Sequence, residues 1–531
     1  MSRERFIHPT VAIEPLYNQW YAWWFLIAPA TAPLFVSKLH RKIMESFVEA
    51  PTLHESALRN PELAGGPYIN YPASRAGQVR ELLDRTLRDQ VATLELAQAL
   101  DELDRLLREG VRPGFSLEAA YRDVPALLRG YVELTYDLHN RPSPRFIEPL
   151  LYRSEHYRES CQSLAMKTVK QDRRAYAFST PRLHDDEHLH IPLPFRHEAV
   201  DLLASMRYRP RDPGEVVEAL GLGGEQIERF KGLLTDEAPP PAPASHDGDA
   251  VRIRYLGHAC VLIETREVTI MSDPVIGYSL GSEPPRYGYH DLPERIDHVL
   301  ITHGHADHLM LETLLQLRHR IGTILVPRSS GGGLADPSLR LLLHHTGFSR
   351  VREIAEMETV EIAGGSITGL PFLGEHGDLQ VHAKIAHLVQ VQGRSILMAA
   401  DSNCIEPRLY DHLRAAVGTI DVLFLGMESE GAPMSWMYGP LLSIPLSRRM
   451  DQSRRLNGSD CTRAVAMIER LSPRQVYIYA MGREPWLGHV MRLDYNDQAP
   501  QILESDRLIA HCRERGIVAE RPFGSSELPC H

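Results

Sequence analysis

The heptapeptide Thr302-His-Gly-His-Ala-Asp-His308 directly follows the apolar run Val299-Leu-Ile in this chain of 531 residues. The apolar run is typical of a buried strand, so the heptapeptide is expected on the loop where that strand ends. His303 and His305 can close on one metal ion. Asp307 and His308 lie on a loop that turns back and can reach a second ion a few ångström away. The spacing therefore predicts a dinuclear metal site.

Strand and helix patterns surround this motif from about residue 250 onward. Paired strands come first and helices are inserted later, which predicts two sheets with helices on their outer faces. Strands are expected over residues 251–255, 261–264, 268–271, 299–302, 324–326, 389–391, 396–400, 422–425 and 476–479, and helices over 310–320, 336–346, 460–471 and 505–515.

The heptapeptide, together with the stretch Tyr255-Leu-Gly-His-Ala-Cys-Val-Leu-Ile-Glu264, resembles the metallo-β-lactamase superfamily over about residues 250 to 500. The resemblance implies an αββα sandwich that holds two metal ions between its sheets. It further implies that Asp401 bridges the metals and that His489 completes the second one. Asp273 matches an acidic residue that orients a ligand from behind. His258 matches no usual ligand and stays unassigned.

One metal ligand remains open between two adjacent residues, Glu375 and His376. If His376 binds, the site resembles that of a dinuclear zinc hydrolase of the lactonase or phosphodiesterase type. If Glu375 binds, the site has three carboxylates, with Asp307 and Asp401. That many hard oxygen donors favours iron over zinc and suits a centre that gives electrons to O₂.

A narrower resemblance favours iron. The chain length, the long N-terminal part, the Gly374-Glu-His-Gly377 segment and the Gly488-His489 ending resemble the metallo-β-lactamase-fold diiron β-hydroxylases of antibiotic biosynthesis, chloramphenicol among the products. These act on amino acids tethered to nonribosomal peptide synthetases. The resemblance implies two Fe ions, held by His303, His305 and Glu375 on one side, by Asp307, His308 and His489 on the other, and by Asp401 between them.

The implied reaction inserts one oxygen atom from O₂ at the β-carbon of an aminoacyl group. That group would be L-p-aminophenylalanine, held as a thioester on a thiolation domain. The chain has no dinucleotide-binding fingerprint and no iron–sulfur cysteine pattern, so an external reductase is expected to supply electrons. Glu428 is a candidate carboxylate beside the metals. Trp436 and Tyr438 are candidates either for an aryl pocket or for core packing.

A proline-rich stretch, Asp236–Asp249, predicts a boundary between two domains, residues 1–245 and 246–531. The N-terminal domain is expected to be mostly helical, with helices over 79–107 and 214–235 and a short extended segment at 189–195. Its expected task is oligomerisation or carrier docking. The fold class is therefore α+β, with a helical domain before the sandwich.

Composition narrows the partners. The chain has 58 Lys+Arg against 69 Asp+Glu, a net charge of −11, which argues against nucleic-acid binding. Six cysteines without a C-x-x-C pair, and a start without signal-peptide features, favour the cytoplasm. The apolar run Trp20–Val36 contains Pro29 and Pro33 and is expected to be a buried segment or subunit interface, not a membrane span, which makes a homodimer plausible. His184, His188 and His190 are expected to form a surface cluster without metal.

Overall fold

Two seven-stranded sheets face each other in the C-terminal half of this computed structural model, which describes residues 4–60, 63, 65–243, 246–493 and 495–530. The first sheet has the order β14-β13-β12-β11-β10-β9-β22 and the second β15-β16-β17-β18-β19-β20-β21. Side chains such as Val261 and Leu325 from the first sheet meet Val389 and Phe424 from the second in a dry core. This arrangement confirms the predicted sandwich.

The strands of the first sheet are β9 (Arg252–Gly257), β10 (Cys260–Glu264), β11 (Thr269–Ser272), β12 (Ile296–Leu300), β13 (Ile321–Pro327), β14 (Val351–Ile354) and β22 (Ser526–Leu528). Those of the second are β15 (Thr359–Ile362), β16 (Gly365–Leu370), β17 (Ala386–Val391), β18 (Arg394–Met398), β19 (Val422–Gly426), β20 (Gln475–Tyr479) and β21 (Val518–Glu520).

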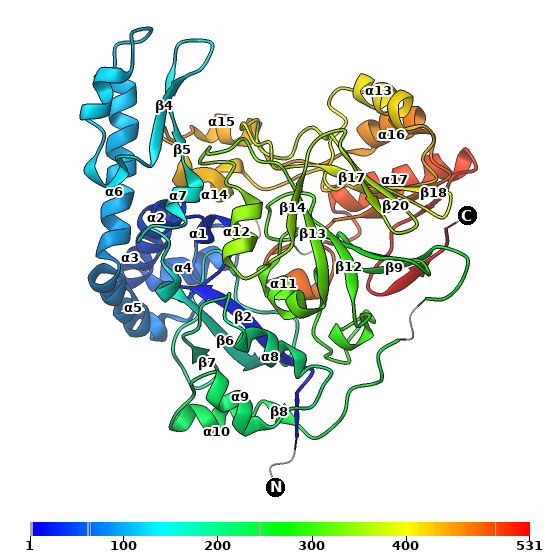
Figure 1. Cartoon of the computed structure of the whole chain (residues 1–531), viewed down its shortest axis with the longest axis horizontal. Coiled ribbons are helices and arrows are strands. Elements are labelled where there is room, and N and C mark those ends of the chain that lie inside the picture. Colours follow the sequence, from blue (N-terminus) through cyan, green and yellow to red (C-terminus); the bar gives the residue numbers. More distant parts are fainter. Residues whose placement is uncertain (1–3, 61–62, 64, 244–245, 494, 531) are drawn as a thin grey trace.

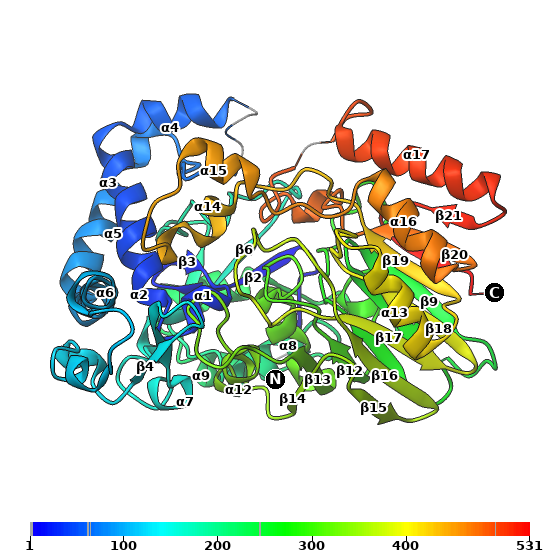
Figure 2. The same cartoon turned by 90° about the horizontal axis from the view of Figure 1, so that it is seen from above.

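Helices cover both outer faces of the sandwich (Figure 2). On the second sheet, apolar side chains such as Leu413, Met467 and Leu508 bury the inward faces of three helices. On the first sheet, α11 and α12 lie between the strands and the N-terminal domain. The bounds are α11 (Leu311–Leu317), α12 (Leu339–His345), α13 (Arg408–Val417), α14 (Met434–Tyr438), α15 (Arg448–Ser453), α16 (Cys461–Leu471) and α17 (Pro500–Glu514).

The N-terminal domain contains the predicted helices and, in addition, a four-stranded sheet of order β3-β2-β6-β7 (Figure 1). The run over 79–107 forms two helices, and the extended segment near 189 is β7. The helices are α1 (Trp24–Ile27), α2 (Ala32–Phe35), α3 (Arg41–Glu49), α4 (Pro51–Leu58), α5 (Ala76–Asp89), α6 (Val91–Arg105), α7 (Glu148–Leu151), α8 (Ala199–Ser205), α9 (Pro213–Ala219) and α10 (Glu225–Lys231). The strands are β1 (Phe6–Ile7), β2 (Val11–Tyr17), β3 (Trp20–Tyr21), β4 (Val132–Tyr136), β5 (Pro142–Phe146), β6 (Gln162–Thr168), β7 (Leu189–Ile191) and β8 (Leu234–Thr235).

The apolar run Trp20–Val36 is buried inside this chain. Trp20 and Trp24 are among the largest fully buried side chains, and a methyl group added at Gly304 would overlap the ring of Trp24. The N-terminal domain therefore packs directly against the histidine-rich loop. Because these side chains are used within the chain, the run is the buried segment and does not supply a subunit interface. No helix in the described part of the chain has the length and apolarity needed to cross a membrane.

Candidate metal centre

The heptapeptide loop leaves the end of β12 and enters the space between the two sheets. His303 and His308 have no exposed surface, and His305 and Asp307 are also buried. Strand β18 delivers Asp401 to the same place, after Ala400, which takes a positive φ of 48°. Loops at the ends of strands from both sheets thus converge on one point.

The segment after β16 brings Glu375 to this point. Glu375 has a φ of 68°, a left-handed conformation that is costly for a residue with a side chain. The conformation aims its carboxylate inward, with Oε1 2.5 Å from His305 Nδ1 and Oε2 3.7 Å from His303 Nε2. His376 contacts the same carboxylate, with Nδ1 2.9 Å from Glu375 Oε2.

Ligand-capable atoms gather in three overlapping groups. Within each group the atoms lie within 4.8 Å of one another. Glu375 belongs to one of them and His376 to none. The groups are His303, His305 and Glu375; His303, His308 and Asp401; and His258, Asp307 and His308.

Hydrogen bonds fix which nitrogen of each histidine faces the centre. Asp273 Oδ2 lies 2.8 Å from His308 Nδ1, so that nitrogen carries the proton and Nε2 presents its lone pair inward. The same carboxylate accepts from the Thr302 hydroxyl at 2.7 Å, and that hydroxyl oxygen lies 3.0 Å from His303 Nδ1. Nδ1 of His303 is therefore the nitrogen that carries the proton, and its Nε2 faces the centre. Asp273 thus orients two ligand histidines, as expected of a residue behind the metals.

In His305 the other ring nitrogen, Nδ1, faces the centre. Its Nε2 lies 2.9 Å from the Tyr438 hydroxyl, which leaves Nδ1 facing Glu375. Tyr438 is fully buried, so its contact with this histidine replaces water at the edge of the site. Sequence reasoning placed Tyr438 near the site without this role.

Buried charge makes the centre attractive to cations. Burial alone would lower the pKa of His308. The negative charges of Asp401, Asp307 and Asp273 outweigh that effect and raise the pKa well above its ordinary range. Burial raises the pKa of Asp401, and burial also lowers the pKa of His303 well below its usual value. These opposed shifts are typical of a functional site.

Four buried ligand atoms at the centre have no hydrogen bond within the described chain: His303 Nε2, His308 Nε2, Glu375 Oε2 and Asp401 Oδ1. Nε2 of the adjacent His376 has none either, although its Nδ1 forms an ion pair with Glu375 Oε2. Unsatisfied buried polar atoms are costly unless an ion or ligand meets them. Two histidine lone pairs and two carboxylate oxygens converging on one point fit metal ions. With Asp307, the donor set contains three carboxylates, which favours iron over zinc.

His489 lies outside these three groups, and its role as a ligand of the second metal stays a prediction. Its Nδ1 is 3.0 Å from the carbonyl oxygen of Trp486, and its Nε2 is 2.7 Å from Arg174 Nη2. In this arrangement the His489 ring contacts the Arg174 guanidinium of the N-terminal domain. Arg174 belongs to the N-terminal domain. Because it is far from His489 in sequence, no local pattern predicts that the two side chains meet.

His258 takes a place beside Asp307 that the sequence analysis left unassigned. Gly482 N–H donates to His258 Nδ1 at 3.1 Å, so the proton of the neutral ring sits on Nε2. That Nε2 lies 3.0 Å from Asp307 Oδ2 and donates to it. A nitrogen that carries a proton cannot bind a metal, so His258 orients Asp307.

Glu428 follows β19 and is partly buried. Burial, followed by the negative charges of Asp401, Asp307 and Glu375, raises its pKa well above the ordinary value. Its carboxyl group therefore interacts electrostatically with the carboxylates of the metal site. Trp436 lies farther out, where its ring contacts Gly65 of the N-terminal domain.

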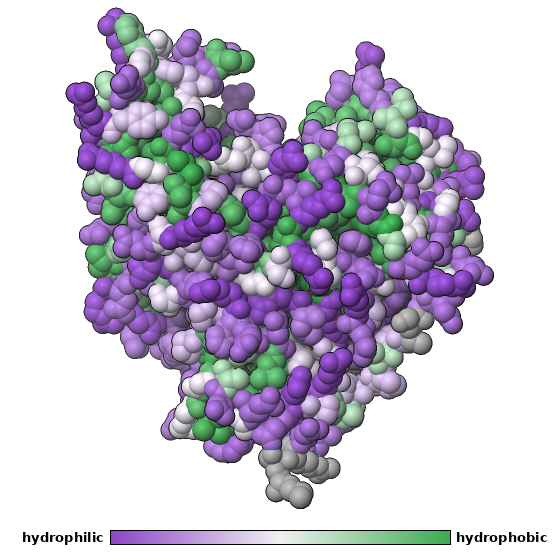
Figure 3. Space-filling view, viewed as in Figure 1, coloured by the Kyte–Doolittle hydropathy of each residue, from purple (hydrophilic) through white to green (hydrophobic). Residues whose placement is uncertain are grey.

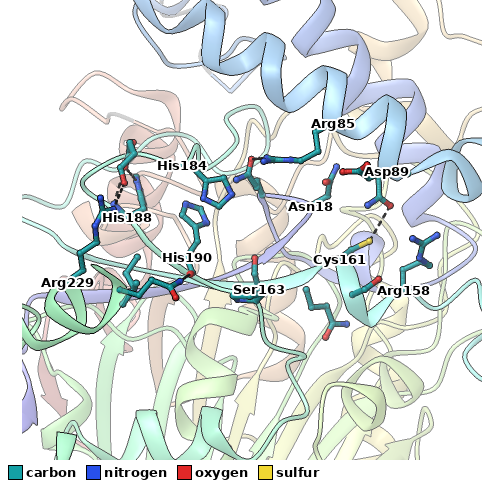
Figure 4. A pocket seen from close by; sticks show the side chains of 18 of the residues that line it. Asn18, Arg85, Asp89, Arg158, Cys161, Ser163, His184, His188, His190 and Arg229 are labelled. Atoms are coloured by element: carbon teal, nitrogen blue, oxygen red, sulfur yellow. Dashed lines mark hydrogen bonds and ion pairs between the residues drawn. The ribbon is translucent and has the colours of Figure 1, made fainter. Parts of the chain in front are cut away.

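The cluster of His184, His188 and His190 lines a separate pocket of about 910 Å³ in the N-terminal domain (Figure 4). His188 Nδ1 is 2.7 Å from Asp185 Oδ1, and the rings of His184 and His190 lie 4.2 Å apart. Among the described residues, no metal-capable trio includes them. Their role without metal stays a prediction.

The sandwich and its buried His/Asp/Glu centre define a metal-dependent enzyme of the metallo-β-lactamase fold. A family model of the β-lactamase superfamily domain matches residues 269–479, and one of the diiron non-heme β-hydroxylase N-terminal domain matches residues 6–239. A metal-dependent hydrolase of the UPF0173 group from Alkaliphilus metalliredigens is 26% identical over 33% of this chain and 72% of its own length.

Other relatives span the whole chain. The 4-amino-L-phenylalanyl-[CmlP-peptidyl-carrier-protein] 3-hydroxylase of Streptomyces venezuelae is 40% identical over 96% of this chain and 97% of its own. The crystal structure of CmlA, a diiron β-hydroxylase from Streptomyces venezuelae, superposes with a TM-score of 0.91 at 38% identity, covering 99% of this chain and 100% of that one. The chain therefore belongs to the diiron non-heme β-hydroxylase family. It is an enzyme whose cofactor is a pair of irons.

Proposed function

We propose that the protein hydroxylates the β-carbon of an aromatic amino acid, 4-amino-L-phenylalanine (L-p-aminophenylalanine), while the amino acid is a thioester on the thiolation (carrier) domain of a nonribosomal peptide synthetase. The named substrate of the relative that matches 96% of the chain supports this assignment. One O₂, two electrons and two protons convert the C–H bond into C–OH and one water. The electrons come from an external reductase, because the chain carries no redox motif besides the metal centre.

The observation that carries the proposal is the position of Glu375. It forms a metal-capable group with His303 and His305, whereas no such group among the described residues includes His376. This supports a site of three carboxylates and argues against the zinc-hydrolase alternative, in which His376 would bind. Bound irons would supply the exchange of electrons with O₂.

We assign the iron ligands from the same geometry. One iron would be held by His303, His305 and Glu375 and the other by Asp307 and His308, with Asp401 between them, and His489 stays the predicted third ligand of the second iron. The remaining side chains hold these ligands in place: Asp273 fixes the His308 and His303 tautomers, Tyr438 fixes His305, and His258 fixes Asp307. Glu428, a partly buried acid after β19, is the candidate carboxylate beside the centre.

Three further features belong to the proposal. All six cysteines are free thiols, five of them buried, which supports a cytoplasmic location. We also propose a homodimer, formed by surfaces other than Trp20–Val36, and test it by size-exclusion chromatography with light scattering. A domain boundary near residue 245 is supported by the linker between β8 and β9, which forms no regular element among its described residues.

Metal content and the optical spectrum of the purified protein test the proposal. Two irons per chain with a near-ultraviolet band that dithionite bleaches would support it. Two zincs per chain and no colour after iron-rich growth would contradict it, and hydrolysis of esters or phosphodiesters would then be assayed.

A further inference from the structure

Helix α15 and the two residues after it carry exposed positive charge on an otherwise acidic protein. Residues 448–455 include four arginines and one aspartate, whereas the whole chain has a net charge of −11. Arg448 and Arg449 are exposed, and Arg455 is partly exposed. The one acid, Asp451, points inward and accepts from the Ser435 hydroxyl at 2.6 Å and from its backbone N–H at 2.9 Å. The outward face is therefore positive.

Two large apolar side chains lie among these arginines. Ile444 is 65% exposed and Met450 is 51% exposed. Apolar side chains ringed by charge are typical of protein interfaces, and methionine adapts to partners of differing shape. We call Ile444, Arg448, Arg449, Met450 and Arg455 the α15 surface.

The α15 surface lies at the hollow between two lobes of the molecule. Figure 3 shows the surface notched at the top, between the lobe of α6 and the β4–β5 hairpin and the lobe of α13 and α16. Helix α15 lies between these lobes in Figures 1 and 2. A partner bound there can reach into the hollow from its rim.

Two short connections join the α15 surface to the metal centre. Asp451 binds Ser435 of α14, and the same helix ends at Tyr438, whose hydroxyl lies 2.9 Å from His305 Nε2. On the other side, Arg454 Nε donates to the carbonyl oxygen of Gly377 at 2.8 Å, two residues beyond Glu375. Helix α14, which contacts His305, and the segment that carries Glu375 are thus both hydrogen-bonded to α15 or to the residue after it.

We propose that the α15 surface is where the aminoacyl-loaded carrier domain docks. The inference rests on the proposed function, because it takes the carrier-bound substrate as given. The partner it fits is a small acidic domain whose flexible arm is attached to a serine through a phosphodiester. An acidic enzyme repels such a partner over most of its surface, so a local cluster of arginines steers it to one face. Arginine also binds phosphodiester oxygens with two parallel hydrogen bonds.

Binding of a fluorescently labelled carrier domain, loaded with 4-amino-L-phenylalanine, tests the proposal by anisotropy, alongside steady-state hydroxylation. The variants are Arg448→Glu/Arg449→Glu and, separately, Met450→Asp. The matched control is Arg266→Glu/Arg295→Glu, which makes the same charge change at arginines that are 60% and 69% exposed elsewhere on the catalytic domain. Iron content and thermal unfolding show whether each variant is folded.

The arginine variant is expected to raise Kd and KM for the loaded carrier at least about tenfold, with kcat at saturation within about twofold of the wild type. Its Kd should also depend less on salt, and the control should behave like the wild type. If both folded α15 variants bind the carrier as the wild type does, the docking site is wrong. Hydroxylation of the loaded carrier by the wild type would in that case still support the proposed function. If the α15 variants keep their carrier affinity but lose electron transfer from the reductase, the α15 surface is a reductase site and the carrier-docking proposal is wrong. A wild type that neither binds nor hydroxylates the loaded carrier overturns both.

Discussion

Oε1 of Glu375 lies 2.5 Å from Nδ1 of His305, and the backbone of Glu375 adopts a left-handed conformation to place it there. The next residue, His376, contacts the other oxygen of the same carboxylate and belongs to none of the metal-capable groups among the described residues. One backbone conformation thus selects the acid over the histidine as the group that meets the metals.

Glu375→Gln is predicted to lower bound iron from two per chain to about one and to abolish hydroxylation, because the neutral amide is a weaker ligand than the carboxylate. His376→Gln should keep both irons. Iron content after gel filtration in a weak chelator measures the difference. Equal iron loss in both variants would show that His376 also binds.

His258→Ala is predicted to weaken binding of the second iron by about 10- to 100-fold, because Asp307 loses the N–H that orients it. His258→Gln can still donate from its amide and should recover part of that affinity. Titration of the metal-free variants with Fe(II) measures both constants. If glutamine binds no better than alanine, His258 is a ligand and the donor role is wrong.

Arg174→Met is predicted to destabilise the protein by about 3–5 kcal/mol, because Glu14 and Glu312 would stay buried without their shared cation. Its exposed neighbour provides the control, since Arg173→Met should change the unfolding free energy by less than about 0.5 kcal/mol. Denaturant unfolding of the iron-loaded proteins makes the comparison. A small effect in Arg174→Met would mean that the two domains do not depend on this network.

Glu428→Gln is predicted to stabilise the metal-free protein at neutral pH. The raised pKa means that the folded state keeps a proton that the unfolded chain releases above the ordinary pKa of 4.5. Stability of the wild type therefore falls as pH rises from about 4.5 through the raised pKa, and glutamine removes that loss. Thermal midpoints should differ by about 1–2 °C at pH 7.5 and converge near pH 4.5. A constant difference across that range would refute the titration.

Local patterns predict the strands of the catalytic domain because these are apolar runs, and they predict the four metal-capable residues of the heptapeptide. Asp401 and Glu375 follow other strands without such a motif and are expected only from the resemblance to a known superfamily. The strand Val11–Tyr17 escapes prediction because it contains Glu14 and Pro15 and shows no alternation. Glu14 is buried only because Arg174 and Arg182, more than 150 residues away, neutralise it. The contact between His489 and Arg174 has no local signal for the same reason, because the two residues are 315 positions apart. The pairing of distant charges cannot be obtained from a local window.

The central claim, O₂-dependent β-hydroxylation at the metal centre, is tested most directly with isotopic oxygen. The iron-loaded, chemically reduced enzyme is mixed with the 4-amino-L-phenylalanyl carrier domain under ¹⁸O₂, and the released amino acid is analysed by mass spectrometry. The account predicts one ¹⁸O atom at the β-carbon, and none with Glu375→Gln. Unmodified amino acid from the wild type, or oxygen that comes from water, would contradict it.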